Sequence, residues 1–233
     1  MTFSIVARCV ETNQFGMAIS SSSPAVAARC AFAKAGVGVV ASQNITDPRL
    51  GPKTLLAMTE GHSAPDAIAI VLKSTEHADF RQLLAVDTSG IAAIHSGSKS
   101  LGVHADFKSL NVAAAGNLLA NSNIPMEMVA TFNESTGHLG DRLISSMRTA
   151  LTYGGETGPV HSAGLLLVDK QDWPMADLRC DWTERCPIEA VAAAWHIYKP
   201  QMDDYVTRAL DPTSAPSYGV PGDDSKFIRQ QDL

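Results

Sequence analysis

The chain is organised around its first nine residues, Met1-Thr2-Phe3-Ser4-Ile5-Val6-Ala7-Arg8-Cys9. Along this stretch, Phe3, Ile5 and Ala7 alternate with Thr2, Ser4 and Val6, so that the two sets would lie on opposite faces of a strand. This period of two, together with the β-branched residues, predicts a β-strand. We expect no leader before the strand, so that Thr2 stands at its first position.

Thr2 is small enough for the initiator methionine to be removed in a cytoplasm. Removal would leave a threonine with an N-terminal α-amino group beside its hydroxyl, which combines a nucleophile and a base in one residue. An α-amino group titrates at about 7.7–8.0 in model peptides, so a useful fraction is neutral at physiological pH. Thr2 is therefore a candidate nucleophile, and an ordinary strand that happens to start with Met-Thr is the alternative.

Length and composition favour one domain. The chain has 233 residues without a break in composition, and we predict a single domain over residues 1–210. An irregular tail is predicted for residues 211–233, which contain Pro212, Pro216, Pro221 and Gly222.

Charge and cysteine usage limit the partners and the location. The formal net charge is -6, and without a basic cluster we expect no nucleic-acid partner. No apolar run approaches the ~20 residues that span a bilayer, so no membrane partner is expected either. The four cysteines, Cys9, Cys30, Cys180 and Cys186, form no CxxC pair and suggest reduced thiols. The sequence therefore predicts a cytoplasmic protein.

The order of predicted elements indicates the fold class. Strands are predicted at residues 15–20, 36–43, 81–87, 91–96, 111–115, 162–169 and 176–181. Helices are predicted at 53–60, 64–74, 125–134, 139–153 and 187–198. Residues 25–35 fit a short helix or an irregular crossing, and residues 97–108 are expected to be irregular. Strands come in antiparallel-looking groups and helices in pairs, which predicts an α+β fold with two packed sheets between helix layers.

An N-terminal nucleophile needs an oxyanion donor, and Asn117 at the end of a strand is the candidate. Gly116 before it would let a substrate approach the backbone, although the pair could also be a self-satisfied Gly-Asn turn. Lys34 could lower the pKa of Thr2 by its charge, unless it is simply a solvated lysine. Ser23, Ser42 and Gln43, at a loop and a strand end, are candidate substrate contacts.

The stretch 177–181 alternates charged residues on one strand face. Asp181 or Asp177 could hold a protonated amine, and Arg179 could pair with either carboxylate or contact the substrate. A structural ladder of ion pairs on one sheet face is the alternative.

Other chemistries have weaker signals. The seven histidines form neither HxH nor HExxH, so no metal site is expected. Neither a Walker loop nor a GxSxG motif occurs, and no cofactor is expected. An internal nucleophile at Cys9, Cys30 or Ser98 would need a neighbouring histidine, which the sequence leaves open.

Several motifs recur in a fixed order in one known family. They are the first eight residues, Ser23-Pro24-Ala25-Val26, residues 35–43, Gly51-Pro52, Gly116-Asn117-Leu118-Leu119-Ala120, His161-Ser162-Ala163 and Asp177-Leu178-Arg179-Cys180-Asp181. Over about residues 1–200 the chain resembles a bacterial family that is catalogued as a domain of unknown function and grouped with the N-terminal-nucleophile (Ntn) hydrolases. Gly158-Pro159-Val160-His161 departs from relatives, which tend to carry basic and Gln residues there.

The resemblance implies a four-layer αββα sandwich whose first strand presents Thr2. It implies hydrolysis of an amide or peptide-like bond in a small molecule, and a homodimer or higher homo-oligomer. Lys34 follows Thr2 by 32 positions (34 − 2), a spacing similar to the catalytic Thr–Lys pair of the proteasome. The alternative is a non-catalytic binding or assembly protein of the same fold that retains Met1.

Overall fold

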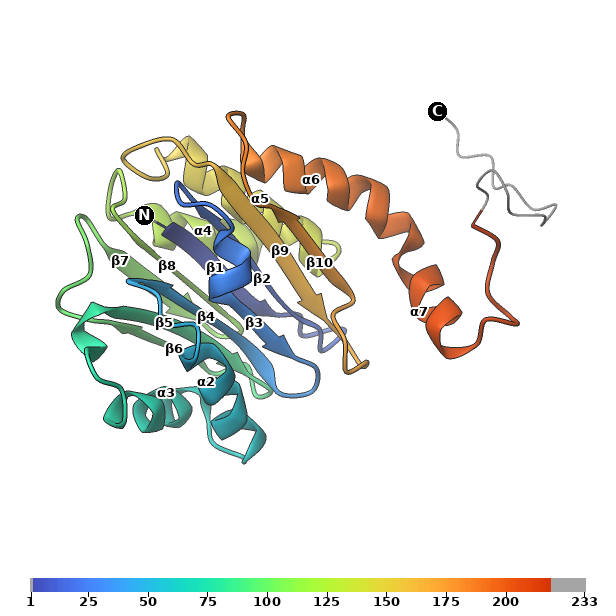
Figure 1. Ribbon diagram of the computed structural model, residues 1–233, viewed down its shortest axis with the longest axis horizontal. Coiled ribbons are helices and arrows are strands. Elements are labelled where there is room, and N and C mark those ends of the chain that lie inside the picture. The colour runs from blue at the N-terminus through green and yellow to red at the C-terminus, as the bar shows by residue number, and fades with distance from the viewer. Residues whose placement is uncertain (1, 219–233) are drawn as a thin grey trace. The chain divides into compact units, whose positions relative to one another are not determined.

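The computed structural model describes residues 2–218 of the chain (Figure 1). The chain divides into two compact units, of which one ends at Trp195 and the other begins at His196. The predicted domain of residues 1–210 with a tail of 211–233 stays a prediction, and residues 219–233 of that tail lie outside the described residues.

Two antiparallel sheets form the first unit. The six-stranded sheet has the order β10 (Ala176–Cys180), β9 (Ser162–Val168), β2 (Phe15–Ser21), β1 (Thr2–Arg8), β8 (Val112–Asn117) and β7 (Ala105–Ser109). The four-stranded sheet has the order β3 (Ala31–Lys34), β4 (Gly38–Asn44), β5 (Arg81–Asp87) and β6 (Ala92–Ser96). The opening stretch of the sequence is thus an inner strand of the larger sheet, as its continuous burial requires.

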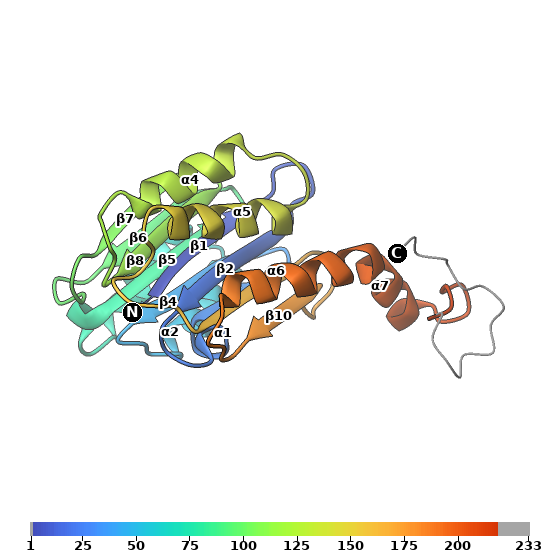
Figure 2. The same cartoon turned by 90° about the horizontal axis from the view of Figure 1, so that it is seen from above.

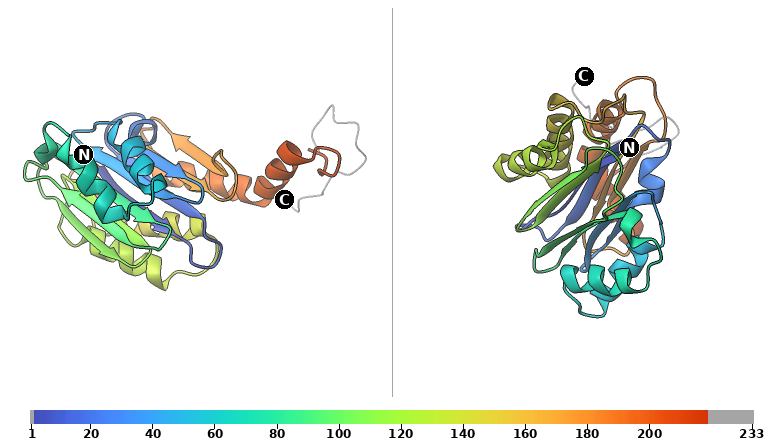
Figure 3. Two further views of the ribbon diagram at one scale, coloured as in Figure 1. Left: turned by 90° about the horizontal axis from the view of Figure 1, so that it is seen from below. Right: turned by 90° about the vertical axis from the view of Figure 1, so that its left-hand side faces the viewer.

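Helices cover the outer face of each sheet. The larger sheet packs against α4 (Ile124–Glu134) and α5 (Leu139–Thr152), and the smaller against α2 (Leu50–Thr59) and α3 (Ala64–Lys73). The inner faces of the sheets pack on each other through β1, β4, β5 and β8. Figures 2 and 3 show the resulting layers. The predicted αββα sandwich with two antiparallel sheets is therefore confirmed.

Local sequence explains the helices that were predicted. In α5 the apolar residues Leu139, Leu143, Ile144 and Met147 are all buried, which is the face that its periodicity marks. The α3 helix begins after Ser63, whose hydroxyl accepts a hydrogen bond from the Asp66 amide. Two further helices are α1 (Val26–Cys30) and α6 (Pro187–Tyr198).

Three elements differ from the prediction. Residues 25–35 contain strand β3 after the short α1, and β7 lies within the region expected to be irregular. The β7 strand is an edge strand with Phe107 and its neighbours exposed, so it carries no alternating apolar signal. In the second unit, a short 3₁₀ turn (Lys199–Gln201) leads into α7 (Met202–Leu210), which the sequence reading did not predict.

Alternation along β1 assigns its side chains to two layers. Val6 belongs to the apolar core between the sheets, together with Ala41 of β4 and Leu84 of β5. Because side chains alternate along a strand, Thr2 and Ser4 point into the same inter-sheet layer as Val6. Within residues 2–218, no helix is both long and apolar enough to cross a membrane.

Candidate active site

The start of β1 lies where several neighbouring strands begin or end. Thr2 pairs in register with Asn117 at the end of β8, and Ser21 at the end of β2 pairs with Ser162 at the start of β9. The Thr2 hydroxyl donates to the Ser21 Oγ at 3.4 Å, and Thr2 is 6% exposed. The structure therefore brings together Thr2 and Asn117, as the sequence predicts.

Beside Thr2 the inter-sheet layer becomes polar. The Ser4 hydroxyl donates to Gln43 Oε1 at 2.6 Å, and Gln43 Nε2 donates to Gln82 Oε1 at 2.8 Å. Gln43 Nε2 also donates to the carbonyl oxygen of Ala115 at 3.2 Å. All three polar side chains are fully buried. Gln43, a predicted substrate contact, thus belongs to a buried network beside Thr2, where it hydrogen-bonds to Ser4 of β1 and to the backbone of β8.

The Asn117 side chain has a hydrogen bond at its amide nitrogen and none at its amide oxygen among the described residues. Its Nδ2 donates to Gln82 Oε1 at 3.3 Å, while its Oδ1 is buried without a hydrogen-bond partner among the described residues. A buried amide oxygen without a partner costs free energy, so such atoms in native proteins point to a missing ligand or a functional role. Directly opposed residues of an antiparallel pair have Cβ atoms about 4.5–5.5 Å apart, so this amide lies beside Thr2.

Gly116 has a packing role, while its predicted role in substrate approach stays a prediction. A Cβ at this position would come within 2.5 Å of Leu119 Cδ2. The backbone carbonyl of Gly116 accepts a hydrogen bond from Gln82 Nε2 at 3.3 Å. The glycine therefore permits the turn after β8, in which Leu118 adopts a positive φ of 51°.

Glu156 is a residue at this edge that the sequence reading missed. Its carboxylate is 4% exposed and accepts hydrogen bonds from the Ser22 amide at 3.2 and 3.3 Å. Ser22 follows Ser21, which contacts Thr2, and Glu156 also forms a β-bridge with Leu119 just after Asn117. Glu156 stands in the loop between α5 and β9 without any motif, so only the folded arrangement reveals it.

The surroundings of Glu156 shift its protonation toward neutral pH. Burial raises the pKa of Glu156 to about 7, against the lowering effects of the Ser22 hydrogen bonds and the nearby His161. A carboxyl group that titrates near pH 7 can both accept and donate a proton at physiological pH.

A hollow of about 390 Å³ adjoins this carboxylate. It is lined by Leu151, Gly154, Glu156, Gly158, Pro159, Val160, Glu184, Arg185 and Cys186. His161 follows the lining residue Val160, and its ring stacks on Trp182 with centroids 4.3 Å apart. The His161 Nδ1 lies 2.9 Å from the Thr183 carbonyl oxygen. The hollow offers space for a small molecule next to the buried acid.

Lys34 lies away from this site. It pairs with Gly38 at the start of β4, whereas Gln43 stands near the other end, five residues or about 17 Å along the strand. Its Nζ donates to Thr59 Oγ1 at 3.1 Å on the exposed surface. The predicted influence of Lys34 on Thr2 is therefore wrong, because equal spacing in sequence does not fix the position of β3.

The two predicted serines differ in position. Ser42 is buried, but its hydroxyl donates to the Asp47 carbonyl oxygen at 2.9 Å, and alternation directs it to the opposite face from Gln43. Ser23 lies in the loop next to the site, where its amide donates to Ser21 Oγ at 3.0 Å. Ser23 therefore stays a candidate contact, and Ser42 does not.

The charged residues of β10 lie at the sheet edge. Three strand spacings, about 14 Å, separate β10 from β1. Arg179 forms a bidentate ion pair with Asp177, at 2.7 and 2.6 Å, and Asp181 is exposed at the end of the strand. The structure does not bring Arg179 or Asp181 to Thr2, and the ion-pair interpretation accounts for Arg179.

Other chemical centres receive less support. Burial raises the pKa of the Cys30 thiol, whose Sγ contacts Thr46 Oγ1 at 3.5 Å, so the reactive thiolate is disfavoured. Across residues 2–218, no group of three or more His, Cys, Asp or Glu side chains is arranged to hold a metal ion.

Comparisons with known proteins agree with this fold. A model described as "Family of unknown function (DUF1028)" matches residues 2–191. Protein SPO2555 from Silicibacter pomeroyi, a crystal structure with the same family model, is similar with a TM-score of 0.79 and 26% identity, over 85% of this chain and 89% of that one.

More distant likenesses are two Anbu structures. The Anbu (Gly-1) mutant from Hyphomicrobium sp. strain MC1 has a TM-score of 0.43 and 10% identity, over 86% of this chain and 96% of that one. Anbu (ancestral beta-subunit) from Yersinia bercovieri has a TM-score of 0.38 and 9% identity, over 87% and 97%. No curated protein matches the chain.

Proposed function

The chain belongs to the family of unknown function DUF1028, and we propose that it is an Ntn-type amidohydrolase with Thr2 as its nucleophile after removal of Met1. The observation that carries the proposal is the setting of Thr2. This residue begins an inner strand, faces a polar inter-sheet layer and stands opposite a buried Asn117 whose amide oxygen lacks a partner among the described residues.

The proposed reaction uses the chain's own groups in two steps. Thr2 Oγ attacks the carbonyl carbon of the substrate, and the α-amino group of the processed Thr2 accepts the hydroxyl proton. As the C–N bond breaks, that proton passes to the leaving nitrogen and an ester to Thr2 remains. Water then attacks the ester, its proton is taken by the same amine, and Thr2 Oγ leaves as the hydroxyl.

Asn117 is assigned to the developing oxyanion. Its Nδ2 carries two N–H donors, and the contact to Gln82 at 3.3 Å uses one of them. The second is available to a carbonyl oxygen bound beside Thr2. Gln43 and Gln82 hold the Asn117 amide from behind, so the donor is oriented before the substrate arrives.

Glu156 is assigned a positioning role toward the α-amino group. Its carboxylate reaches the Thr2 edge through Ser22 and Ser21, and it titrates in the same range as an α-amine. A carboxylate there would orient the amine and exchange a proton with it near pH 7. The substrate is proposed to be a small amide or peptide-like molecule that occupies the hollow beside Glu156.

Location and assembly are part of the proposal. A cytoplasmic protein would meet the aminopeptidase that removes Met1 before a small residue. A homodimer or higher homo-oligomer is proposed from the family resemblance, and light scattering of the purified protein would measure it.

The test is covalent labelling by a threonine-directed electrophile such as a β-lactone, followed by peptide mass spectrometry. We expect one adduct, on Thr2, in the untagged protein and none in Thr2→Ala. Thr2→Ser should keep labelling because it retains the hydroxyl. Thr12→Ala, which removes an exposed threonine from the turn after β1, is the matched control and should label normally.

Labelling that persists in Thr2→Ala would overturn the proposal. Retention of Met1 in the purified protein, with no labelling, would favour the non-catalytic binding or assembly protein.

A further inference from the structure

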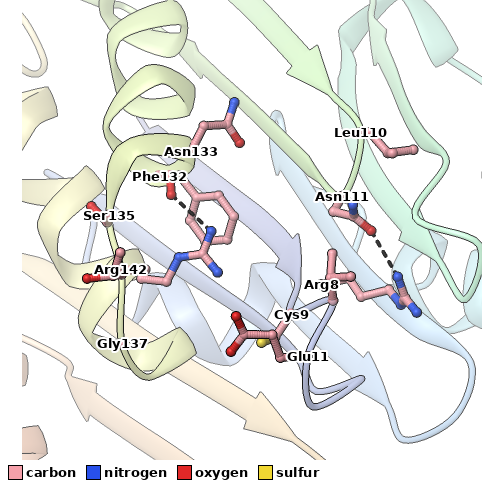
Figure 4. A pocket seen from close by; sticks show the side chains of 12 residues that line it. Arg8, Cys9, Glu11, Leu110, Asn111, Phe132, Asn133, Ser135, Gly137 and Arg142 are labelled. Carbon is pink, nitrogen blue, oxygen red and sulfur yellow. Dashed lines mark hydrogen bonds between the residues drawn. The ribbon is translucent and has the colours of Figure 1, made fainter.

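A second hollow lies at the end of β1 that carries Arg8, the opposite end from Thr2. Figure 4 shows the side chains that line it. Its volume is about 290 Å³, and it is bounded by the turn after β1, the turn before β8 and the segment between α4 and α5. It is lined mostly by polar side chains: Arg8, Glu11, Asn111, Asn133, Ser135, Thr136 and Arg142. Arg8 ends the strand that Thr2 begins, so about 20 Å separates this hollow from the proposed nucleophile.

Arg8 is held in place by two amide side chains. Its Nη1 donates to Asn111 Oδ1 at 3.0 Å, and its Nη2 donates to Asn13 Oδ1 at 2.5 Å. A guanidinium group carries five N–H donors, so these contacts fix its orientation without using all of them.

Arg142 is fixed by a different set of contacts. Its guanidinium carbon lies 4.0 Å from the centre of the Phe132 ring, and its Nη2 donates to the Phe132 carbonyl oxygen at 3.0 Å. Its Nε is buried and has no hydrogen-bond partner among the described residues. Stacking on an aromatic ring restrains the fork and reduces the entropy lost when it binds a ligand.

The two arginines of the hollow form no ion pair with a carboxylate among the described residues. Arg49, Arg148 and Arg179 each form an ion pair with a carboxylate. Within residues 2–218, neither Arg8 nor Arg142 has a carboxylate oxygen within 4.0 Å. Glu11 also lines the hollow, and in Figure 4 it lies between the two guanidinium groups in this view.

We propose that this hollow binds the carboxylate or phosphate group of a small molecule through Arg8 and Arg142. Guanidinium forks match both anions because they present parallel N–H donors to two oxygens. The second N–H of the Asn133 amide and the hydroxyl of Thr136 supply further donors around such a group, whereas the Ser135 hydroxyl already donates to the Thr131 carbonyl oxygen. The site is separate from the Thr2 edge and does not depend on the proposed hydrolase activity.

The test is calorimetric titration of the full chain with inorganic phosphate and, in a second arm, with succinate. We expect saturable binding of at least one of them that weakens as the salt concentration rises. Arg142→Gln and Arg8→Gln should each weaken it by about tenfold or more, because each removes charged hydrogen bonds. Arg148→Gln is the matched control, since it removes an exposed arginine from the same helix as Arg142, and it should leave binding unchanged.

Glu11→Gln tests the sign of the ligand's charge. Loss of this carboxylate should tighten binding of the anion by about two- to fivefold, as expected for one exposed charge. Thr2→Ala should bind like the parent protein, which separates this result from any failure of the hydrolase proposal. Absence of saturable binding in both arms, or equal binding by the parent protein and both arginine variants with folding verified by circular dichroism, would overturn the proposal.

Discussion

The layer between the two sheets differs at its two ends. Away from Thr2 it is apolar, with Val6, Ala41 and Leu84 packed among the sheets. Beside Thr2 it is polar, with Ser4, Gln43 and Gln82 linked by hydrogen bonds. An apolar layer stabilises the sandwich by removing surface from water, whereas a buried polar layer needs complete hydrogen bonding and orients specific groups. The side chains that stabilise the sandwich and those of the candidate site therefore occupy separate parts of the same layer.

Among the variants that test this difference, Asn117→Ala at the polar end is expected to have the largest effect. We expect the rate of Thr2 labelling to fall by about 100- to 1000-fold, the usual cost of losing an oxyanion donor. Asn133→Ala, which removes an exposed asparagine from α4, is the control and should react normally. Mass spectrometry measures the labelling rate of each variant. An unchanged rate for Asn117→Ala would remove that residue from the mechanism.

The apolar end should give the opposite result. Leu84→Ala deletes a fully buried side chain and should lower the free energy of unfolding by about 2–5 kcal/mol. Urea denaturation measures this loss. The labelling rate of the protein that stays folded should be within about twofold of the parent rate, because Leu84, two residues from Gln82 on β5, makes none of the hydrogen bonds of the polar network. A large fall in that rate would mean that the two ends are not separate.

Glu156→Gln should change how stability depends on pH. The pKa of Glu156 in the folded protein is about 7, above its ordinary value of 4.5. Its stabilising effect is therefore full below about pH 4.5 and is lost as the pH rises through about 7, by about 3 kcal/mol in all. In the variant, the free energy of unfolding measured by urea denaturation should not show this decrease between pH 5 and pH 8.

The control for that measurement is Glu134→Gln, which changes an exposed glutamate at the end of α4. It should keep the parent pH dependence. An equal fall in stability between pH 5 and pH 8 in Glu156→Gln and the parent protein would contradict the assignment to Glu156.

The smallest effect is expected from Lys34→Met. Lys34 pairs with the start of β4 and contacts Thr59, so the labelling rate should stay within about twofold of the parent rate. A labelling rate that is lower by tenfold or more would mean that Lys34 acts on Thr2, and would contradict the position of β3 in the structure.

The sequence predicts most of the fold because its signals are local. Alternation fixes β1, and amphipathic spacing fixes α5. The edge strand β7 could not be predicted, because its exposed residues do not show the alternation of apolar and polar side chains that marks a half-buried strand. The pairing of Thr2 with Asn117 follows from two strand ends that meet, whereas the positions of Lys34 and Arg179 depend on sheet order, which local patterns do not encode.

Glu156 shows the same limit at the candidate site. A single glutamate in a loop carries no signal in sequence, and its burial arises only when the turn after β8 and the turn after β2 meet around it. Gln43 could be predicted as a polar residue at the end of a buried strand, but its role behind Asn117 required the facing sheet.

Thr2 can act as proposed only through its own α-amino group, and the intact mass of the untagged protein purified from cytoplasm shows whether that amine is present. We expect a mass that lacks one methionine, so that Thr2 carries the amine. A full-length mass with Met1 retained would contradict it, because the amine would then belong to another residue and could not serve as the base.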